Sequence, residues 1–162
     1  MSLLGLCEWL SETSLSIGIR ESFWVYPMLH FAHILSISVM FGSIVFLDLR
    51  LVGAGFRQRR VTDVAEQLLP WTWAGYILMF SSGALIFSSD PVHYYESGLF
   101  RLKLFLMLLA GVNALVFHYT VYRGVAAWDL DLPPARARLT GAISITAWVA
   151  VIIVGRAVGY FS

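Results

Sequence analysis

Residues 23–52 read FWVYPMLHFAHILSISVMFGSIVFLDLRLV, and Asp48 and Arg50 are the only acidic or basic residues in this stretch besides two histidines. A helix that crosses a membrane needs about 20 mainly apolar residues. This run is about 30 residues long, so a helix made from it would tilt or project beyond the hydrocarbon. The stretch therefore predicts a first transmembrane helix.

Three further apolar stretches follow, at residues 68–88, 102–122 and 142–161. The four predicted spans use most of the 162 residues and leave no room for a soluble domain. The sequence thus predicts an all-α fold: an integral membrane four-helix bundle that forms a single domain over residues 1–162.

The composition agrees with a membrane protein. Hydrophobic residues make up 59% of the chain and charged residues 13%, whereas soluble domains average about 45–50% and about 25%. The formal net charge of +1 gives no electrostatic reason to expect a nucleic-acid partner. Cys7 is the only cysteine, so no disulfide can form within the chain.

The residues before the first span follow helical spacing, with small or apolar side chains on one face at Leu3, Leu6, Cys7, Leu10, Ser14 and Ile17. This pattern predicts a short amphipathic helix at the membrane interface. Glu8 and Glu12 interrupt the apolar run, and no basic region precedes it, so a secretory signal peptide is not expected.

Basic residues in short loops predict orientation, because the cytoplasmic side carries the excess. Seven of them lie at the ends of the first and third spans: Arg50, Arg57, Arg59, Arg60, Arg123, Arg136 and Arg138. Four lie on the opposite side: Arg20, Arg101, Lys103 and Arg156. We therefore expect both loops in the cytoplasm of a bacterial cell, and both termini in the periplasm.

Ionisable side chains inside the spans point to function, because they are costly in lipid and usually face the interior of a bundle. At about 100° per residue, His30 and His33 lie about 60° apart on one helix face, and Asp48 falls on the same stripe five turns later. His118 belongs near the cytoplasmic surface, where it could meet Asp48. The outer cluster contains His30, His33, Lys103, Arg156 and, from the outer loop, His93.

The outer cluster has the groups that a membrane-embedded haem b needs. Such a haem takes neutral imidazoles on the iron, an apolar slot for the ring, and cations near its two propionates. His30 and His33 are the candidate iron ligands, with His118 and His93 as further candidates. Lys103 and Arg156 are candidates to pair with propionates.

Several alternatives remain open at this stage. Two histidines on one helix cannot hold one iron from opposite faces of the ring, so either one ligates and the other supports it, or each binds its own haem in a closely spaced pair. Copper is a second cofactor class, because imidazole and the thioether of Met28 or Met40 suit it. In a third reading the histidines form a structural polar cluster with no cofactor.

The chain also resembles a known family. The segments that carry the resemblance are Trp9-Leu10, Ile19-Arg20-Glu21-Ser22, His33-Ile34-Leu35, Asp48-Leu49-Arg50-Leu51, Leu69-Pro70-Trp71-Thr72-Trp73-Ala74-Gly75, Phe100-Arg101-Leu102-Lys103-Leu104, Asn113-Ala114-Leu115-Val116-Phe117-His118 and Gly155-Arg156. They are similar to an uncharacterised family of small bacterial four-span membrane proteins, over nearly the whole chain. The architecture is also similar to that of four-helix b-type cytochromes, although the histidines here are not two pairs on two helices.

Three functions follow as expectations. The first is a haem b protein that transfers electrons between a quinone or a periplasmic partner and an acceptor. The second is a copper- or other metal-handling protein, and the third is a membrane subunit without a cofactor. Glycine-rich helix faces suggest a homo-oligomer. The sequence contains no nucleophile–base motif, phosphate loop or Cys-x-x-Cys, so hydrolysis, nucleotide binding and c-type haem attachment are not expected. Whether the protein is an enzyme of another class stays open.

Overall fold

The computed structural model describes residues 2–161, and every regular element in that range is a helix. The short helices are α1 (Leu3–Ser11), α2 (Ser14–Glu21) and α5 (Pro91–Glu96), and the long ones are α3 (Val25–Val52), α4 (Val61–Ser89), α6 (Gly98–Val116) and α7 (Ala135–Phe161). Helix α6 continues as a π-helix at Phe117–Val121 and a 3-10 helix at Tyr122–Ala127. The predicted all-helical fold is therefore confirmed.

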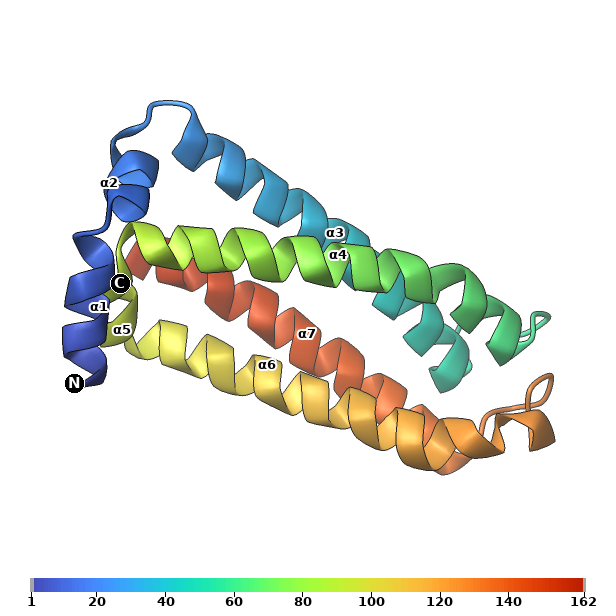
Figure 1. Ribbon diagram of the computed structural model, residues 1–162. Helices are drawn as coiled ribbons and strands as arrows, with labels where there is room; N and C mark the ends of the chain where they lie inside the picture. Colours follow the sequence, from blue (N-terminus) through green and yellow to red (C-terminus); the bar gives the residue numbers. More distant parts are fainter. Residues whose placement is uncertain (1, 162) are drawn as a thin grey trace.

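The long helices run alongside one another, and the short ones gather at one end (Figure 1). Helices α1, α2 and α5 and both chain ends lie at what we call the terminal end. The α3–α4 and α6–α7 connections lie at the opposite end, which we call the loop end. The chain thus keeps its two basic loops together, far from its termini.

Among the residues that the structure describes, three helices are long and apolar enough to cross a membrane: α3, the continuous Gly98–Ala127 segment, and α7. Their outward side chains include many large exposed hydrophobic residues, among them Phe31, Leu108 and Ile153. Such a surface suits contact with lipid and is unusual for a protein in water. Helix α4 is equally long, but its Trp, Tyr, Thr and Ser residues make it less apolar than the other three.

The helices extend beyond the predicted spans at the loop end. Helix α4 begins at Val61, where we expected residue 68, and α7 begins at Ala135, where we expected residue 142. The added turns contain polar residues such as Asp63 and Arg138. Hydropathy marks only the part of a helix that suits lipid, whereas the backbone is already helical in the polar turns before that part.

The amino-terminal region forms two short helices in place of the predicted single amphipathic helix. The chain bends at Glu12–Thr13, because the Thr13 side chain accepts a hydrogen bond from the Ser16 backbone N–H at 3.3 Å and starts α2. The Ser2 hydroxyl caps α1 in the same way, accepting from the Gly5 N–H at 3.1 Å. Side-chain caps of this kind satisfy the free N–H groups of a new helix.

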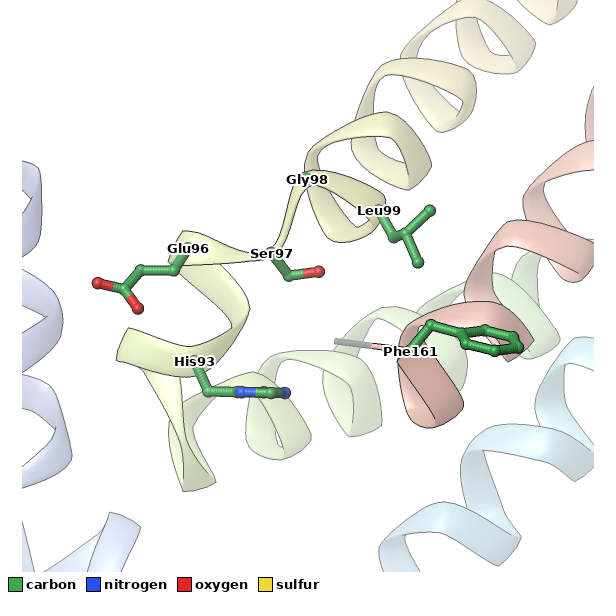
Figure 2. A pocket seen from close by; sticks show the side chains of 6 residues that line it. All are labelled: His93, Glu96, Ser97, Gly98, Leu99 and Phe161. Atoms are coloured by element: carbon green, nitrogen blue, oxygen red, sulfur yellow. The ribbon is translucent and has the colours of Figure 1, made fainter.

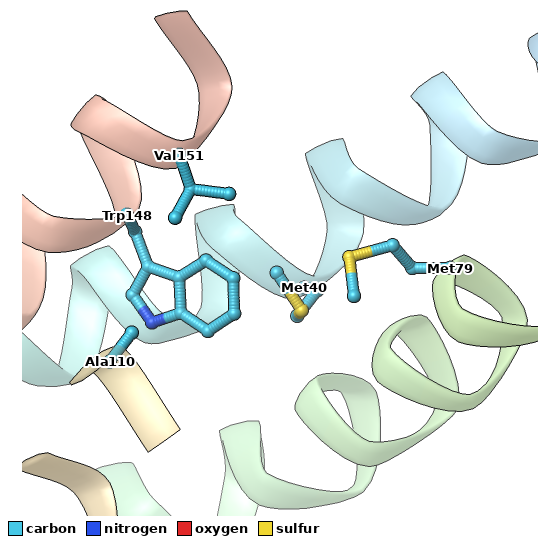
Figure 3. Close-up of a cluster of buried hydrophobic side chains, with 5 residues drawn as sticks. All are labelled: Met40, Met79, Ala110, Trp148 and Val151. Atoms are coloured by element: carbon cyan, nitrogen blue, oxygen red, sulfur yellow. The ribbon is translucent and has the colours of Figure 1, made fainter. Parts of the chain in front are cut away.

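A buried cluster at the middle of the molecule contains residues from all four long helices. Figure 3 shows Met40 of α3, Met79 of α4, Ala110 of α6, and Trp148 and Val151 of α7. Helix α3 packs along both α4 and α7, and α6 packs along α7, whereas α4 and α6 make no comparable contact over the described residues. The cluster therefore joins an open series of helices in the order α4, α3, α7, α6.

Arg50 and Asp129 hold the loop end together. The Arg50 side chain is 1% exposed, and it donates hydrogen bonds to the backbone carbonyls of Arg59 at 2.8 Å, Asp129 at 2.9 Å and Asp131 at 3.4 Å. The Asp129 carboxylate accepts from the Thr62 N–H at 2.9 Å and hydroxyl at 2.7 Å, which caps α4. Partial burial alone would raise the pKa of the Asp129 carboxyl, but these hydrogen bonds outweigh it and leave the pKa below its usual range.

Candidate functional site

His33 lies on α3 in the half of the molecule nearer the terminal end and reaches across to α4. Its Nδ1 lies 2.9 Å from the Ser82 hydroxyl oxygen, while that hydroxyl donates to the Leu78 carbonyl at 2.6 Å. A serine hydroxyl has one proton to donate. In the arrangement where a backbone carbonyl of Leu78 or Met79 takes that proton, the His33 Nδ1–H donates to Ser82.

Gly83 makes room for the same ring. A Cβ atom at Gly83 would stand 3.1 Å from the His33 Cε1 atom, which is too close for ordinary packing. The imidazole therefore lies flush against the α4 backbone, with its position fixed by Ser82 on one side and Gly83 on the other.

His30 is oriented by its own helix. Its Nδ1 lies 3.1 Å from the Tyr26 carbonyl oxygen, and its ring centroid lies 4.4 Å from that of Tyr26. A carbonyl can only accept, so Nδ1 again carries the proton. In this tautomer of a neutral imidazole, Nε2 of each histidine carries no proton, and its lone pair could bind a metal.

Lys103 brings a cation to the same region from α6. Its aliphatic chain crosses α7 at Gly155, where a Cβ atom would stand 3.4 Å from the Lys103 Cε. The lysine is half-buried, and its charge acts on the His33 imidazole. Within residues 2–161 the ammonium has no hydrogen-bond or ion-pair partner, so it is free to pair with an anion.

Arg156 and His93 are exposed, whereas Lys103 is half-buried. Arg156 is exposed on α7 and donates to the Tyr160 hydroxyl at 2.7 Å, with its guanidinium 4.7 Å from the centre of that ring. His93 is exposed on α5, and it lines an open cavity of about 520 Å³ with Phe161 of α7 (Figure 2). Both residues belong to the terminal end, as predicted.

His118 and Asp48 do not form the pair expected at the loop end. His118 is exposed on the π-helical turn, where its ring stacks on Tyr122 with centroids 5.9 Å apart. Asp48 is 5% exposed, and its hydrogen-bonding partner is Ser144 of α7. The extra residue of a π-helical turn changes the direction of His118, an effect that straight-helix geometry cannot predict.

The copper donor set is also not assembled. Met40 is buried in the central cluster, and Met28 is 53% exposed on the outside of α3. Among the described residues, no group of three or more His, Cys, Asp or Glu side chains converges in a way that could hold a metal ion. Any metal at the histidines would therefore need another source of ligands.

Ser82 was not predicted from the sequence, and Gly83 was predicted only as a small residue that lets helix backbones approach, although these two residues position His33. The signal was the run Ser81-Ser82-Gly83, the most polar point in the middle of the second predicted span. Spacing alone could not tell which serine faces α3, because that depends on how two helices are rotated against each other.

Comparison with known proteins gives a family and no activity. A family of unknown function (DUF6644) matches residues 7–162 of the chain. Comparison with curated proteins and with solved structures finds no match. The family match covers nearly the whole chain, as the sequence resemblance led us to expect, and the protein therefore belongs to this family of unknown function.

Proposed function

We propose that the protein binds haem b in the membrane and transfers electrons, with His33 as the main iron ligand. The observation that supports this is the placement of His33: its Nδ1 lies 2.9 Å from the Ser82 hydroxyl oxygen, Gly83 makes room for its ring, and Lys103 lies nearby on α6. Histidines that ligate metals usually donate their other ring N–H to a neighbouring acceptor, which fixes the ring and raises its basicity.

The donor set fits haem better than a bare metal ion. Haem needs only one or two imidazoles from the protein, because the porphyrin supplies the other iron ligands. The absence of a three-residue metal cluster among the described residues is therefore compatible with haem, whereas copper would need more protein ligands than converge here. When bound, haem would supply one-electron redox chemistry.

The remaining residues of the cluster have supporting roles in this proposal. His30 has the same free nitrogen as His33, so it is the candidate ligand for a second haem or a support for the first. Lys103 would pair with a propionate, because its ammonium lacks a partner and its methylene groups pack on Gly155. Arg156 lies on the exposed surface of α7 and would pair with the second propionate of the haem.

We further propose a four-span arrangement in a bacterial cell membrane. Helix α4 packs along α3 and supplies Ser82 to His33, which supports its crossing the membrane beside the other three. The loop end carries seven of the eleven basic residues, which favours the cytoplasm. The termini, the histidines and Lys103 would then lie toward the periplasm, near a quinone or a periplasmic redox partner. The chain would also form a homo-oligomer.

The test is the haem content and visible spectrum of the protein purified from membranes. We expect an intense Soret band in the wild type, loss of most haem in His33→Ala, and a partial loss or a shifted spectrum in His30→Ala. About half of the haem remaining in each single variant would indicate a haem pair. His93→Ala is the matched control, because this exposed histidine should leave the haem content unchanged.

Two outcomes would overturn the proposal. Full haem retention in the His30→Ala/His33→Ala double variant would remove both residues from the site. Colourless wild-type protein that contains copper would favour metal handling, and colourless protein without a metal would favour a structural polar cluster.

A further inference from the structure

A buried carboxyl group lies in the other half of the molecule, away from the histidines. Asp48 is 5% exposed, and its Oδ2 atom is buried without a hydrogen-bond partner. Within residues 2–161, Ser144 of α7 is the one side chain that hydrogen-bonds the carboxyl. Asp48 lies four residues before the end of α3, or about 6 Å along the helix axis.

Helix packing seals this carboxyl from its surroundings. A Cβ atom at Gly141 of α7 would stand 3.2 Å from the Asp48 carbonyl oxygen and 3.2 Å from the Leu51 Cβ atom. The absence of a side chain at Gly141 lets α3 and α7 approach closely at this level. The Asp48 side chain therefore lies against α7 and is almost fully shielded from lipid and water.

No cation compensates a negative charge at this position. The Arg50 guanidinium, two residues further along, is occupied by three backbone carbonyls of the loops. On α7, Arg136 and Arg138 are exposed, and on α4 the buried residues at the start of the helix are apolar (Val61, Val64 and Ala65). Asp63 and Glu66, the acidic side chains of α4, are exposed. An ionised carboxylate buried without a cation is strongly unfavourable.

A metal cation does not fit the surroundings either. Sites for hard cations bring several oxygen ligands together, whereas here one carboxyl and one hydroxyl meet between two helices. Among the described residues, no further acidic, histidine or cysteine side chain completes a cation site. A single proton neutralises the carboxyl without additional ligands.

We propose that Asp48 is a proton-binding site inside the membrane, which carries its proton at neutral pH. The site needs no haem, because it is built only from Asp48, Ser144 and the close approach at Gly141. Its ligand is the proton, and its position gives the protein a titratable group near the cytoplasmic side of the membrane.

The experiment is labelling with dicyclohexylcarbodiimide, an apolar reagent that reacts with protonated carboxyl groups. The whole protein in lipid vesicles is treated at pH 7, and the modified residues are mapped by mass spectrometry. We expect the label on Asp48, with less label as the pH rises, and none at that position in Asp48→Asn. Asp63→Asn is the matched control, because it removes an exposed carboxyl and should leave the labelling of Asp48 unchanged.

An infrared measurement makes the result independent of reagent access. We expect a C=O stretch from a protonated carboxyl, shifted by exchange into D₂O and absent in Asp48→Asn. An Asp48 that shows only carboxylate bands at pH 7 would overturn the proposal. Labelling that is blocked by sodium at constant pH would also overturn it, because the ligand would then be a metal cation.

Discussion

At the scale of single residues, the structure turns a candidate histidine into a defined chemical group. The sequence pattern singled out His33, but a pattern of residue types cannot say what the ring contacts. The contact of its Nδ1 is Ser82, which lies 49 residues away and also hydrogen-bonds the Leu78 carbonyl. Orientation across two helices is a property of their packing, and the order of residues does not encode it locally.

The first prediction concerns this hydrogen bond. Ser82→Ala removes the acceptor for the His33 Nδ1–H, so the imidazole loses both its orientation and its support as a ligand. Loss of such a partner typically weakens metal affinity about 10–100-fold. We expect a corresponding fall in haem affinity, measured by titration of haem into apoprotein. Ser81→Ala is the control, since Ser81 is exposed, and equal affinities in the two variants would contradict the role of Ser82.

The second prediction concerns acid stability at Asp129. The hydrogen bonds from Thr62 leave the pKa of this carboxyl lower in the folded protein than in the unfolded chain. The stabilisation is therefore fully present above the unfolded value of about 3.9 and is lost as the pH falls through the folded value. Asp129→Ala should lower the unfolding temperature at pH 7. The difference in unfolding temperature between the variant and the wild type should become smaller below about pH 4. A difference in unfolding temperature that does not change with pH would contradict the role of the Asp129 carboxylate.

At the scale of elements, close helix contacts depend on glycine at particular turns. At Gly75 a Cβ atom would stand 2.8 Å from the backbone nitrogen of Met40, so α3 and α4 touch through their backbones there. Gly111 lies in the middle of α6 with no atom within 4 Å of the corresponding position. The two glycines look alike in the sequence, and only the packing distinguishes them.

The third prediction compares these glycines. Gly75→Ala must push α3 and α4 apart, and overpacking of this kind costs about 1–3 kcal/mol. Gly111→Ala should be neutral or slightly stabilising, because alanine favours a helix more than glycine does. Thermal unfolding of both variants in the same detergent measures the difference. Equal unfolding temperatures would show that the α3–α4 contact tolerates a methyl group.

The elements themselves were predictable to different degrees. Hydropathy located α3, α6 and α7, because long apolar stretches suit only a few structures. It did not locate the polar first turns of α4 and α7, which are held by the Asp129 cap and by packing at the loop end. It also could not predict the π-helical turn at His118, which depends on the backbone register within α6.

At the scale of the whole molecule, both chain ends lie at one end of the helices and both basic loops at the other (Figure 1). The fourth prediction follows from this arrangement and the excess of arginine in the loops. Alkaline phosphatase fused after residue 162 should be active, because this reporter folds only in the periplasm. The same reporter inserted at Gln58, in the α3–α4 connection, should be inactive. The opposite pair of results would reverse the orientation and the sides assigned to His33 and Asp48.

The candidate site shows where sequence reasoning reaches its limit. Helical periodicity placed His30, His33 and Asp48 on one helix, because they share a local repeat. It could not determine that α3 packs between α4 and α7, so the surroundings of each side chain stayed unknown. The unforeseen contact of His33 with Ser82 and the wrong partner for Asp48 have this same cause.

The Arg50 contacts have a consequence for how the protein is made. Two of the carbonyls that hold Arg50 belong to Asp129 and Asp131, which lie 79 and 81 residues later in the chain. Asp129 also caps α4 from 67 residues away. The first helical hairpin is thus synthesised with an arginine that lacks two of its three carbonyl acceptors and with an α4 start that lacks its Asp129 cap, and neither is completed until the ribosome has passed residue 131. A chain truncated after α4 would lack these partners, so the hairpin should be an early target for the proteases that survey newly inserted membrane proteins.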